Sequence, residues 1–494
     1  MPNAHSQVRC LLCYFLKRAE FQEWTVLGSV LGSDSKYPGP KLFQATNLVR
    51  IWYVLRGQWV HQVTAQHEKY GPIVRVGPNE LSYVTEEAWN DIYKTRKGEE
   101  QLKKIFPQTP NSQHGLMDNP FDDEQAVCRK ILASTINDKA LRQKESILQK
   151  NISAFVMQLQ RKVRDGAGKA VLDLANGYEC VAFDIIGDLF SGETFGCLNN
   201  LELPPLHGEL VGGLKQLAVG TAFQTSALTR FLFLSSEPPP LAAVLETTRR
   251  LENRQKSLEK SKDDVLSHVF QEVGRRNGID QKLATRLAAD AIIGGFDTIA
   301  IAMVGTTYFL VKNPSKLAKA TDEIRSKLRS VDDITLANVN SLRYLSAVFS
   351  EGLRLWPPGP ETQRRFTNAQ GNFINGDLIP PKTLVGVYHW TAGRYSRAWT
   401  DADSFVPERW LEEGMNGKYA NDQRGVVNSF QAGPRNCPGQ ALASAEFRLV
   451  LATLLWHFDI AAADSGVPDW SKTKIFGLLA NKQPLMVKIS PRSA

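Results

Sequence analysis

The sequence lacks the patterns that mark several large classes of protein. Its 494 residues contain no internal repeat, no low-complexity tract, no phosphate-binding loop and no H-E-x-x-H zinc motif. These absences argue against a repeat protein, a disordered chain, a P-loop nucleotidase and a zinc-dependent protease of the H-E-x-x-H type. The chemistry of this chain must therefore come from another kind of site.

Cysteine is scarce, and its spacing forms no regular disulfide framework. The six cysteines are Cys10, Cys13, Cys128, Cys180, Cys197 and Cys437. This usage is typical of a reducing, intracellular compartment. Cys10 and Cys13 form a C-x-x-C pair, but no second pair of ligands completes a zinc site.

A long apolar run is missing from the first 36 residues. The apolar stretches 10–16 and 24–31 fall short of the roughly 18 residues that a membrane span needs, and no signal-peptide pattern is present. Pro38 and Pro40 then fix the backbone in Y-P-G-P. We therefore expect an N-terminal segment, 1–36, whose anchor is missing or shortened, followed by one domain over 37–494.

Charge excludes little but favours some partners. The chain has 59 basic and 51 acidic residues, a net charge of +8 spread along its length. Such a mild excess predicts no nucleic-acid partner. It suits an anionic membrane surface or an acidic redox protein.

The most informative stretch that is present surrounds Cys437. It reads F-Q-A-G-P-R-N-C-P-G-Q-A-L-A over residues 430–443, with Gly433 and Gly439 on either side of the cysteine. We expect a tight loop that enters a helix over 440–457. A lone cysteine is more often a small buried apolar residue than a ligand. A helix N-terminus, however, lowers a cysteine pKa, so Cys437 could be an anionic metal ligand.

A second key element is the apolar stretch 291–311, which is long enough to span a membrane. Asp297 and the pair Gly294-Gly295 lie in its first half, and charges inside membrane spans are rare. The sequence therefore predicts a helix buried in a globular core. The two glycines weaken a helix by about 1 kcal/mol each, which permits a local widening, and the Thr298 hydroxyl can bond back to the preceding turn or to water.

A pair of opposite charges lies in the predicted helix 342–356. Glu351 and Arg354 are one turn apart on one face. An exposed pair is the usual outcome of this spacing, but the flanking apolar residues and Pro357-Pro358 favour burial. Arg409, in F-V-P-E-R-W, supplies a second arginine. Further helices are expected at 46–70 and 125–136, and a β-hairpin at 73–84.

Together these patterns resemble the cytochrome P-450, or haem-thiolate, family. The loop matches its haem-binding pattern F-x-x-G-x-R-x-C-x-G, and G-G-F-D-T over 294–298 matches its oxygen-binding pattern. The phrase H-E-K-Y-G-P-I-V-R-V-G-P-N-E-L at 67–81 resembles fungal members of secondary-metabolite type. The resemblance runs from residue 37 to the C-terminus. It implies a mainly α fold with a small β-rich part.

The resemblance also implies roles for individual residues. Cys437 would be the axial ligand of haem b, Phe430 would pack beside its sulfur, and Asp297 and Thr298 would relay protons to oxygen. Haem-contacting residues would be Gly433, Gly439, Arg435, Arg365, Arg129 and Gln125, where Gln125 replaces the family's usual aromatic side chain. Glu351, Arg354 and Arg409 would form a buried charge triad beneath the haem loop.

The activity that the resemblance implies is insertion of one oxygen atom from O2 into a small apolar terpenoid, polyketide or alkaloid, by hydroxylation or epoxidation. Electrons would come from NADPH through NADPH-cytochrome P-450 reductase, a diflavin protein, with cytochrome b5 as an optional second donor. The protein would be a monomer at the endoplasmic reticulum membrane, or cytosolic if the N-terminus is complete. Two alternatives stay open: an oxygen-independent isomerase, dehydratase or nitric oxide reductase, and a non-catalytic haem-binding sensor.

Overall fold

A computed structural model of the chain describes the part of the protein that carries these motifs. The described residues are 36–95, 100–105, 116, 122–225, 245–246, 249–250, 264–271, 281–464, 466, 468–477, 479–480 and 482–493. Nearly all of the predicted N-terminal segment 1–36 therefore lies outside the described residues.

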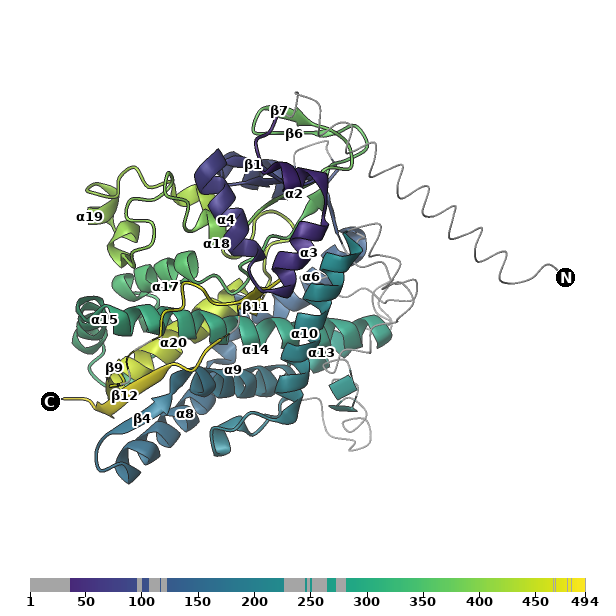
Figure 1. Cartoon of the computed structure of the whole chain (residues 1–494). Helices are drawn as coiled ribbons and strands as arrows, with labels where there is room; N and C mark the ends of the chain where they lie inside the picture. Colours follow the sequence, from purple (N-terminus) through teal and green to yellow (C-terminus); the bar gives the residue numbers. More distant parts are fainter. Residues whose placement is uncertain are drawn as a thin grey trace.

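The helix α14, Gln281–Lys312, runs through the middle of the helical part (Figure 1). It packs against α9 (Leu174–Ser191), α17 (Arg343–Leu355) and α20 (Gln440–His457). Within the described ranges, α14 alone has the length and hydropathy of a membrane span, yet 78% of its most apolar window is buried inside the protein. The prediction of a core helix here is confirmed.

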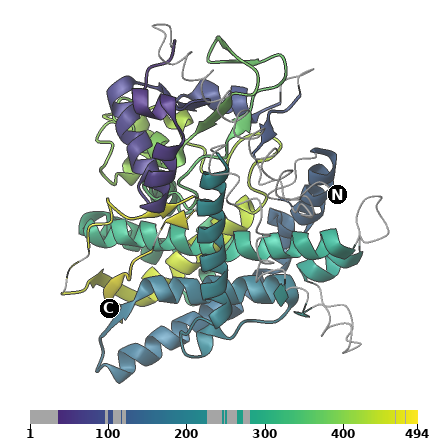
Figure 2. The same ribbon diagram turned by 45° about the vertical axis from the view of Figure 1, so that its right-hand side comes forward.

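The remaining helices surround this centre. Figure 2 shows α14 crossing the molecule, with α8 (Glu145–Asp165) and α9 on one side and the first described helices and strands of the chain on the other. Their bounds are α2 Lys41–Ala45, α3 Leu48–Leu55, α4 Trp59–Tyr70, α5 Glu86–Tyr93, α6 Asp122–Ile136, α7 Asp138–Gln143, α8 Glu145–Asp165, α10 Pro205–Gln224, α13 Val265–Gln271, α15 Pro314–Lys327, α16 Leu336–Val339, α18 His389–Ala392 and α19 Glu412–Met415, with short 3-10 turns η1 Cys197–Asn199, η2 Val331–Asp333, η3 Pro407–Trp410 and η4 Arg424–Val426.

The largest sheet has the strand order β1-β2-β8-β5-β3. Strands β1 and β2 form the antiparallel hairpin that the sequence predicts, and β2 then pairs in parallel with β8, about 300 positions later in the chain. The bounds are β1 Ile73–Gly77, β2 Glu80–Tyr83, β3 Lys103–Lys104, β5 Arg365–Phe366 and β8 Leu384–Val387.

Three smaller strand groups complete the β part. The strands β4, β12 and β9 form an antiparallel sheet with β12 in the middle, while β6 pairs with β7 and β10 with β11. Their bounds are β4 Ala170–Asp173, β6 Asn372–Ile374, β7 Asp377–Ile379, β9 Phe458–Ala462, β10 Ile475–Phe476, β11 Leu479–Ala480 and β12 Met486–Pro491.

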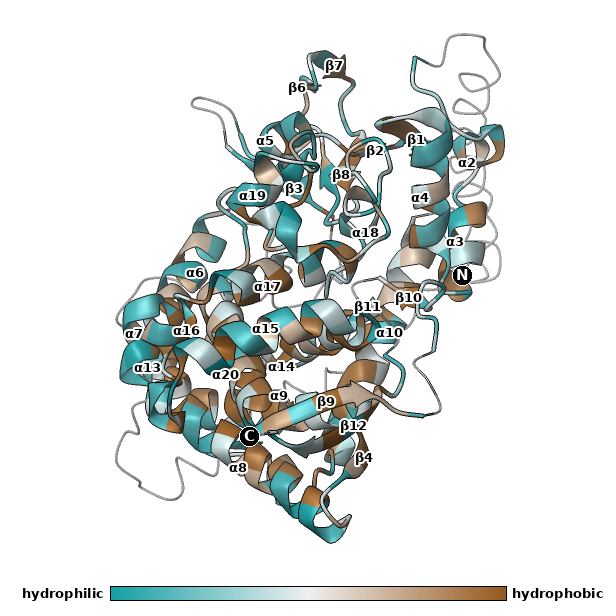
Figure 3. Cartoon of the chain, turned by 90° about the vertical axis from the view of Figure 1, so that its left-hand side faces the viewer, coloured by the Kyte–Doolittle hydropathy of each residue, from teal (hydrophilic) through white to brown (hydrophobic). Residues whose placement is uncertain are grey.

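Hydropathy follows this arrangement. Figure 3 shows hydrophobic ribbon concentrated in α9, α14 and α20, whereas α8 and α15 at the surface alternate between hydrophilic and hydrophobic residues. The central helices are buried on most sides, and the outer ones bury a single stripe. The fold is mainly α with a small β-rich part, as predicted.

One predicted helix, 46–70, is in fact two. Gly57 has a φ of +67°, and its N–H bonds to the carbonyl of Val54 at 2.9 Å, which ends α3 before α4 begins. A Cβ at this position would lie 2.7 Å from the Cβ of Lys474, a contact from the C-terminal third of the chain. The break therefore depends on tertiary packing, which the helical pattern of 46–70 does not reveal.

Candidate active site

The loop before α20 presents the Cys437 side chain. The backbone N–H of Cys437 donates to the carbonyl of Phe430 at 2.7 Å, which closes the loop across seven residues. Cys437 is exposed, whereas Cys128, Cys180 and Cys197 are buried. Phe430 is half-buried, with its ring centre 6.4 Å from that of Phe349 on α17. Among the described cysteines, Cys437 is thus the one whose sulfur is open to a ligand.

The two glycines of the loop, Gly433 and Gly439, have different structural roles. Gly433 has a φ of +76°, and a Cβ there would lie 1.9 Å from the carbonyl oxygen of Tyr93, at the end of α5. Gly439 caps α20 with an ordinary φ of −84°, and its Cβ would meet only the Cys437 sulfur, at 3.8 Å. Gly433 is therefore required by backbone conformation and by contact with α5, while the space beside Gly439 is open to a flat group.

The pKa of Cys437 differs from the sequence-based expectation. Although Cys437 is exposed on one side, the protein atoms that surround the thiol partly desolvate it and raise its pKa, while the N–H of Gly439 and the positive charge of Arg129 act in the opposite direction. The helix N-terminus therefore lowers the pKa of Cys437 through the Gly439 N–H, as expected, but burial outweighs this contribution and the net pKa is raised. Coordination to a metal ion would remove the thiol proton.

The middle of α14 leaves one strip uncovered. Thr298 is exposed, although its neighbours Asp297 and Ile299 are buried, and Gly294 and Ala291, one and two turns earlier, are only half-buried. A Cβ on Gly294 would meet nothing within 4 Å. This helix packs against α20, which follows the Cys437 loop. A strip of small side chains on it leaves space for a flat group such as haem, and the Cys437 sulfur offers a ligand for its iron.

Thr298 bonds back to its own helix. Its hydroxyl donates to the carbonyl of Gly294 at 2.6 Å, the arrangement that a threonine in a helix favours. The backbone of α14 nevertheless continues as one α-helix through Gly294 and Gly295. The local widening that the glycine pair would permit is therefore not present, and α14 stays a regular helix at this point.

Asp297 lies on a different side of α14 from Thr298. Its carboxylate is buried and forms an ion pair with the ammonium of Lys482, in the segment between β11 and β12. The same ammonium lies 2.5 Å from Glu179 on α9. Neither Lys482 nor Glu179 was predicted, because each is far from Asp297 in sequence and stands in no recognisable motif.

The residues expected to hold haem carboxylates differ in their surroundings. Arg129 donates through both terminal nitrogens to Asn436, the residue next to Cys437. Arg365 is buried and donates to the carbonyls of Gln363, at 3.0 Å, and Arg364. Arg435 in the loop and Gln125 on α6, one turn before Arg129, are also buried.

The predicted charged residues beneath the loop do meet. Arg354 donates to both oxygens of Glu351 at 2.8 Å, and Arg409 donates to one of them at 3.1 Å. All three side chains are fully buried. Glu351 also accepts from the backbone of Val406 at 2.8 Å and from the indole of Trp410 at 2.9 Å. Since the two cations and these donors surround it, the pKa of Glu351 is lowered despite its burial.

Asp422 completes this cluster and was missed by sequence reasoning. It forms a buried ion pair with Arg409, so that two carboxylates balance two guanidinium groups. Arg354 uses its remaining N–H groups on the carbonyls of Ala402, at 2.7 Å, and Ser404, at 2.9 Å. Buried charges are tolerated when they are paired and hydrogen-bonded in this way.

The fold and the loop define the class, a haem-thiolate protein, and comparison with known proteins gives the family. The family model for cytochrome P450 matches residues 40–489, so the chain belongs to the cytochrome P450 family. It is 34% identical to the cytochrome P450 monooxygenase cpaH of Aspergillus oryzae, over 92% of this chain and 89% of that protein. It is 32% identical to the averantin hydroxylase of Dothistroma septosporum, over 93% and 87%, and to that of Aspergillus parasiticus, over 92% of each chain.

These relatives give the class of enzyme. The chain is an oxygenase of the oxidoreductase class, of the type found in fungal secondary metabolism, and its family uses a haem-thiolate iron and a redox partner. The relatives are named as monooxygenases and hydroxylases, which favours oxygen insertion over the oxygen-independent and non-catalytic alternatives.

Proposed function

We propose that this chain hydroxylates or epoxidises an apolar secondary metabolite, a terpenoid, polyketide or alkaloid, with electrons from NADPH delivered by NADPH-cytochrome P-450 reductase. The observation that carries the proposal is the exposed Cys437 thiol in a closed loop, behind which α20 packs against α14, the helix that carries the open strip. The thiol suits the iron of a flat cofactor, and the strip of small residues suits an apolar substrate.

Cys437 is the proposed iron ligand. Haem b held by the Cys437 thiolate would supply the activation of dioxygen, a chemistry that a cysteine thiolate ligand promotes. Phe430, whose carbonyl accepts from the Cys437 N–H and whose side chain packs against the main core, would shield the sulfur from water, while Gly439 would leave room for the macrocycle. Gly433 holds the loop against α5 through its left-handed conformation, so it shapes the site from the other side of the loop.

Arg435, Arg365, Arg129 and Gln125 are the proposed partners of the haem carboxylates. Guanidinium groups pair with carboxylates in bidentate fashion, and an amide donates a single hydrogen bond. Arg129 bonds to Asn436, so it also ties α6 to the cysteine loop. Glu351, Arg354 and Arg409 lock the segment 400–410 under the loop through their buried pairs.

Thr298 and Asp297 are the proposed proton relay. The Thr298 hydroxyl is exposed on the open strip and can exchange its bond to Gly294 for one to water. Asp297 is the acid that would supply the proton from the protein side. We place the catalytic domain at 37–494, as a monomer with peripheral contact to the endoplasmic reticulum membrane.

An isotope experiment tests this function. The haem-loaded protein, the reductase and NADPH are incubated under 18O2 with the intermediate that accumulates in a strain lacking this enzyme. We expect a product that is one 18O atom heavier, with one NADPH consumed per product. A product that contains no 18O would show an oxygen-independent reaction, and no product with any accumulated intermediate would contradict the proposed substrate class.

A further inference from the structure

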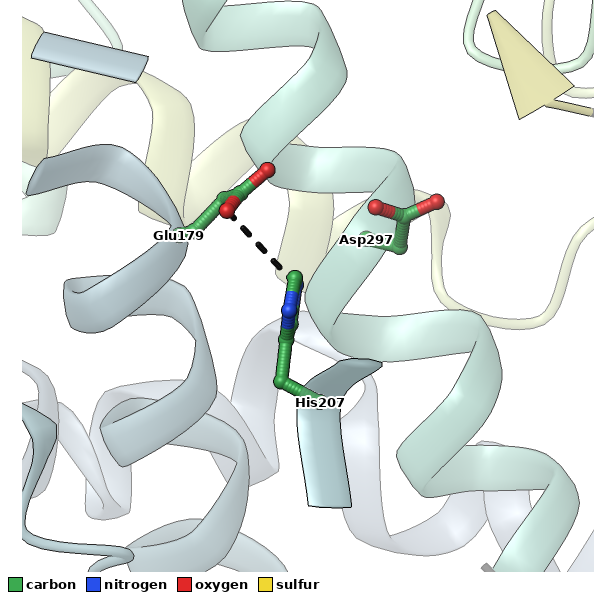
Figure 4. Close-up of side chains that lie close together, drawn as sticks. All are labelled: Glu179, His207 and Asp297. Atoms are coloured by element: carbon green, nitrogen blue, oxygen red, sulfur yellow. Dashed lines mark ion pairs between the residues drawn. The ribbon is translucent and has the colours of Figure 1, made fainter. Parts of the chain in front are cut away.

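A cluster of ionisable side chains lies next to the proposed relay and is not used by it. Figure 4 shows Glu179, His207 and Asp297 projecting from α9, α10 and α14 into the same space. Their ligand atoms all lie within 4.8 Å of one another, a spacing that could hold a metal ion. Lys482 already places its ammonium between the two carboxylates, however, so a cation occupies the centre of charge.

The cluster is not balanced in charge. One ammonium faces two carboxylates, so with a neutral imidazole the group carries one net negative charge. His207 is the member that can correct this. Its Nε2 is buried, lies 3.6 Å from an oxygen of Glu179, and has no hydrogen-bond partner among the described residues. A proton on that nitrogen would make the cluster neutral and would create a bond to Glu179.

The surroundings strengthen these interactions. The ring of His207 packs edge-on against Phe296, with ring centres 5.6 Å apart, and against Phe183, at 6.0 Å. Apolar walls of this kind reduce screening between charges. The side chains of His207, Glu179 and Lys482 are 11–13% exposed, whereas that of Asp297 is 3% exposed. Solvent exposure therefore decreases from His207, Glu179 and Lys482 to Asp297, the most buried acid of the cluster.

We propose that His207 and Glu179 take up a proton from solvent and pass it to Asp297, with Lys482 as the positioning residue that holds the two carboxylates together. The transfer is balanced: hydronium from solvent gives one proton to the imidazole and leaves water, and the Glu179 carboxylate stabilises the imidazolium. The imidazole returns to neutral as Asp297 becomes a carboxylic acid, and Asp297 returns to a carboxylate when it passes the proton to the Thr298 side. The inference rests on the proposed role of Asp297 and Thr298 and names the route that supplies them.

The groups facing His207 set its titration. Burial lowers the pKa of His207, Lys482 from the β11–β12 segment lowers it further, and Glu179 from α9 and Asp297 from α14 oppose both. His207 is therefore neutral at neutral pH and loads as the pH falls. Asp297 and Glu179 raise the pKa of Lys482 although burial alone would lower it, so the lysine stays charged.

The first test is a pH titration of His207 in the haem-loaded protein. The titration is monitored by NMR of isotope-labelled imidazole groups. His207→Gln identifies the signal among the eight histidines. Lys482→Met should raise the pKa of His207 by about one unit, because a nearby positive charge is removed, and Glu179→Gln should lower it. The signal of His268 on α13, which bonds to Ser134 at 3.1 Å, is the internal control and should be the same in every variant.

The second test follows the proton during turnover, with reductase, NADPH and oxygen but no substrate. In the parent protein, the share of electrons lost as hydrogen peroxide should rise with pH. In His207→Gln it should be raised several-fold at low pH and vary little with pH, and His268→Gln should match the parent.

The outcomes separate this inference from the proposed function. If Thr298→Ala increases peroxide and His207→Gln does not, the route through His207 is wrong and the relay stands. If Thr298→Ala changes nothing, the relay itself fails. If the pKa of His207 does not rise in Lys482→Met and does not fall in Glu179→Gln, the proposed role of the cluster is wrong. If one of the two variants does not fold, the other alone decides the question.

Discussion

The two sides of the proposed haem site treat charge differently. Beneath the cysteine loop, Glu351 and Asp422 face Arg354 and Arg409, every group is fully buried, and the charges cancel. On the side of α14, Lys482 faces two carboxylates and the imidazole of His207, whose Nε2 has no hydrogen-bond partner within the described part of the chain. The first arrangement has no proton to exchange and serves to fix a backbone. The second is one proton short of neutrality, and that deficit is what suits it to proton transfer.

The largest effect is expected from the loss of the Cys437 sulfur, because both sides of the site are defined by the haem that this sulfur would hold. Cys437→Ala should abolish the thiolate-type Soret band of the reduced carbon monoxide complex, because no thiolate remains to bind iron. Cys128→Ala, at a buried cysteine on α6, should keep the band. An unchanged band in Cys437→Ala would refute the ligand assignment.

The second-largest effect is expected from a substitution in the charge-balanced cluster beneath the cysteine loop. Glu351→Ala leaves two guanidinium groups facing each other in a buried space, which costs about 3–5 kcal/mol. We expect little haem-loaded protein and a large drop in the denaturation midpoint, measured by pigment content and urea unfolding. Lys418→Ala, which removes an exposed pair with Asp401, is the matched control and should leave both readouts near those of the parent. Normal haem content in Glu351→Ala would discredit the cluster as a lock.

The two loop glycines offer a smaller and more selective test. Gly433→Ala should lower the free energy of unfolding by at least about 1–2 kcal/mol, since alanine is strained at a φ of +76° and would overlap Tyr93. Gly439→Ala should cost under about 1 kcal/mol in unfolding and instead weaken haem binding. If Gly439→Ala binds haem normally, the space beside Gly439 does not receive the macrocycle.

The smallest structural change should affect the α14 side alone. Thr298→Ala removes one hydroxyl from the open strip, so unfolding should match the parent while several-fold more NADPH electrons appear as hydrogen peroxide. Thr298→Ser keeps the hydroxyl and should restore most of the coupling. Equal peroxide yields from Thr298→Ala and the parent would remove the hydroxyl from the relay.

What the sequence could predict depends on how local the interaction is. Glu351 and Arg354 are one helical turn apart, so their pairing is visible from spacing, and the loop around Cys437 matches a contiguous pattern. Asp422 and Lys482 reach the same clusters from distant segments and belong to no motif. The same limit explains the pKa of Cys437, where the helix N-terminus acts locally but burial by the whole fold outweighs it.

Gly433 shows a second kind of limit. Its place in the pattern is evident from the sequence, but the reason for it is not. The pattern suggests close approach to the macrocycle, whereas the structure shows a left-handed residue beneath the carbonyl of Tyr93, more than 300 positions earlier in the chain.

The strand order of the small sheet has a consequence for biosynthesis. Strand β4 ends at Asp173, but its partner β12 begins at Met486 and lies between β4 and β9. A ribosome that adds about 5–20 residues per second needs roughly 15–60 s to travel that distance. Throughout this interval β4 has an unpaired edge, so chaperone occupancy on nascent chains should peak before residue 486 emerges and fall once β12 can dock.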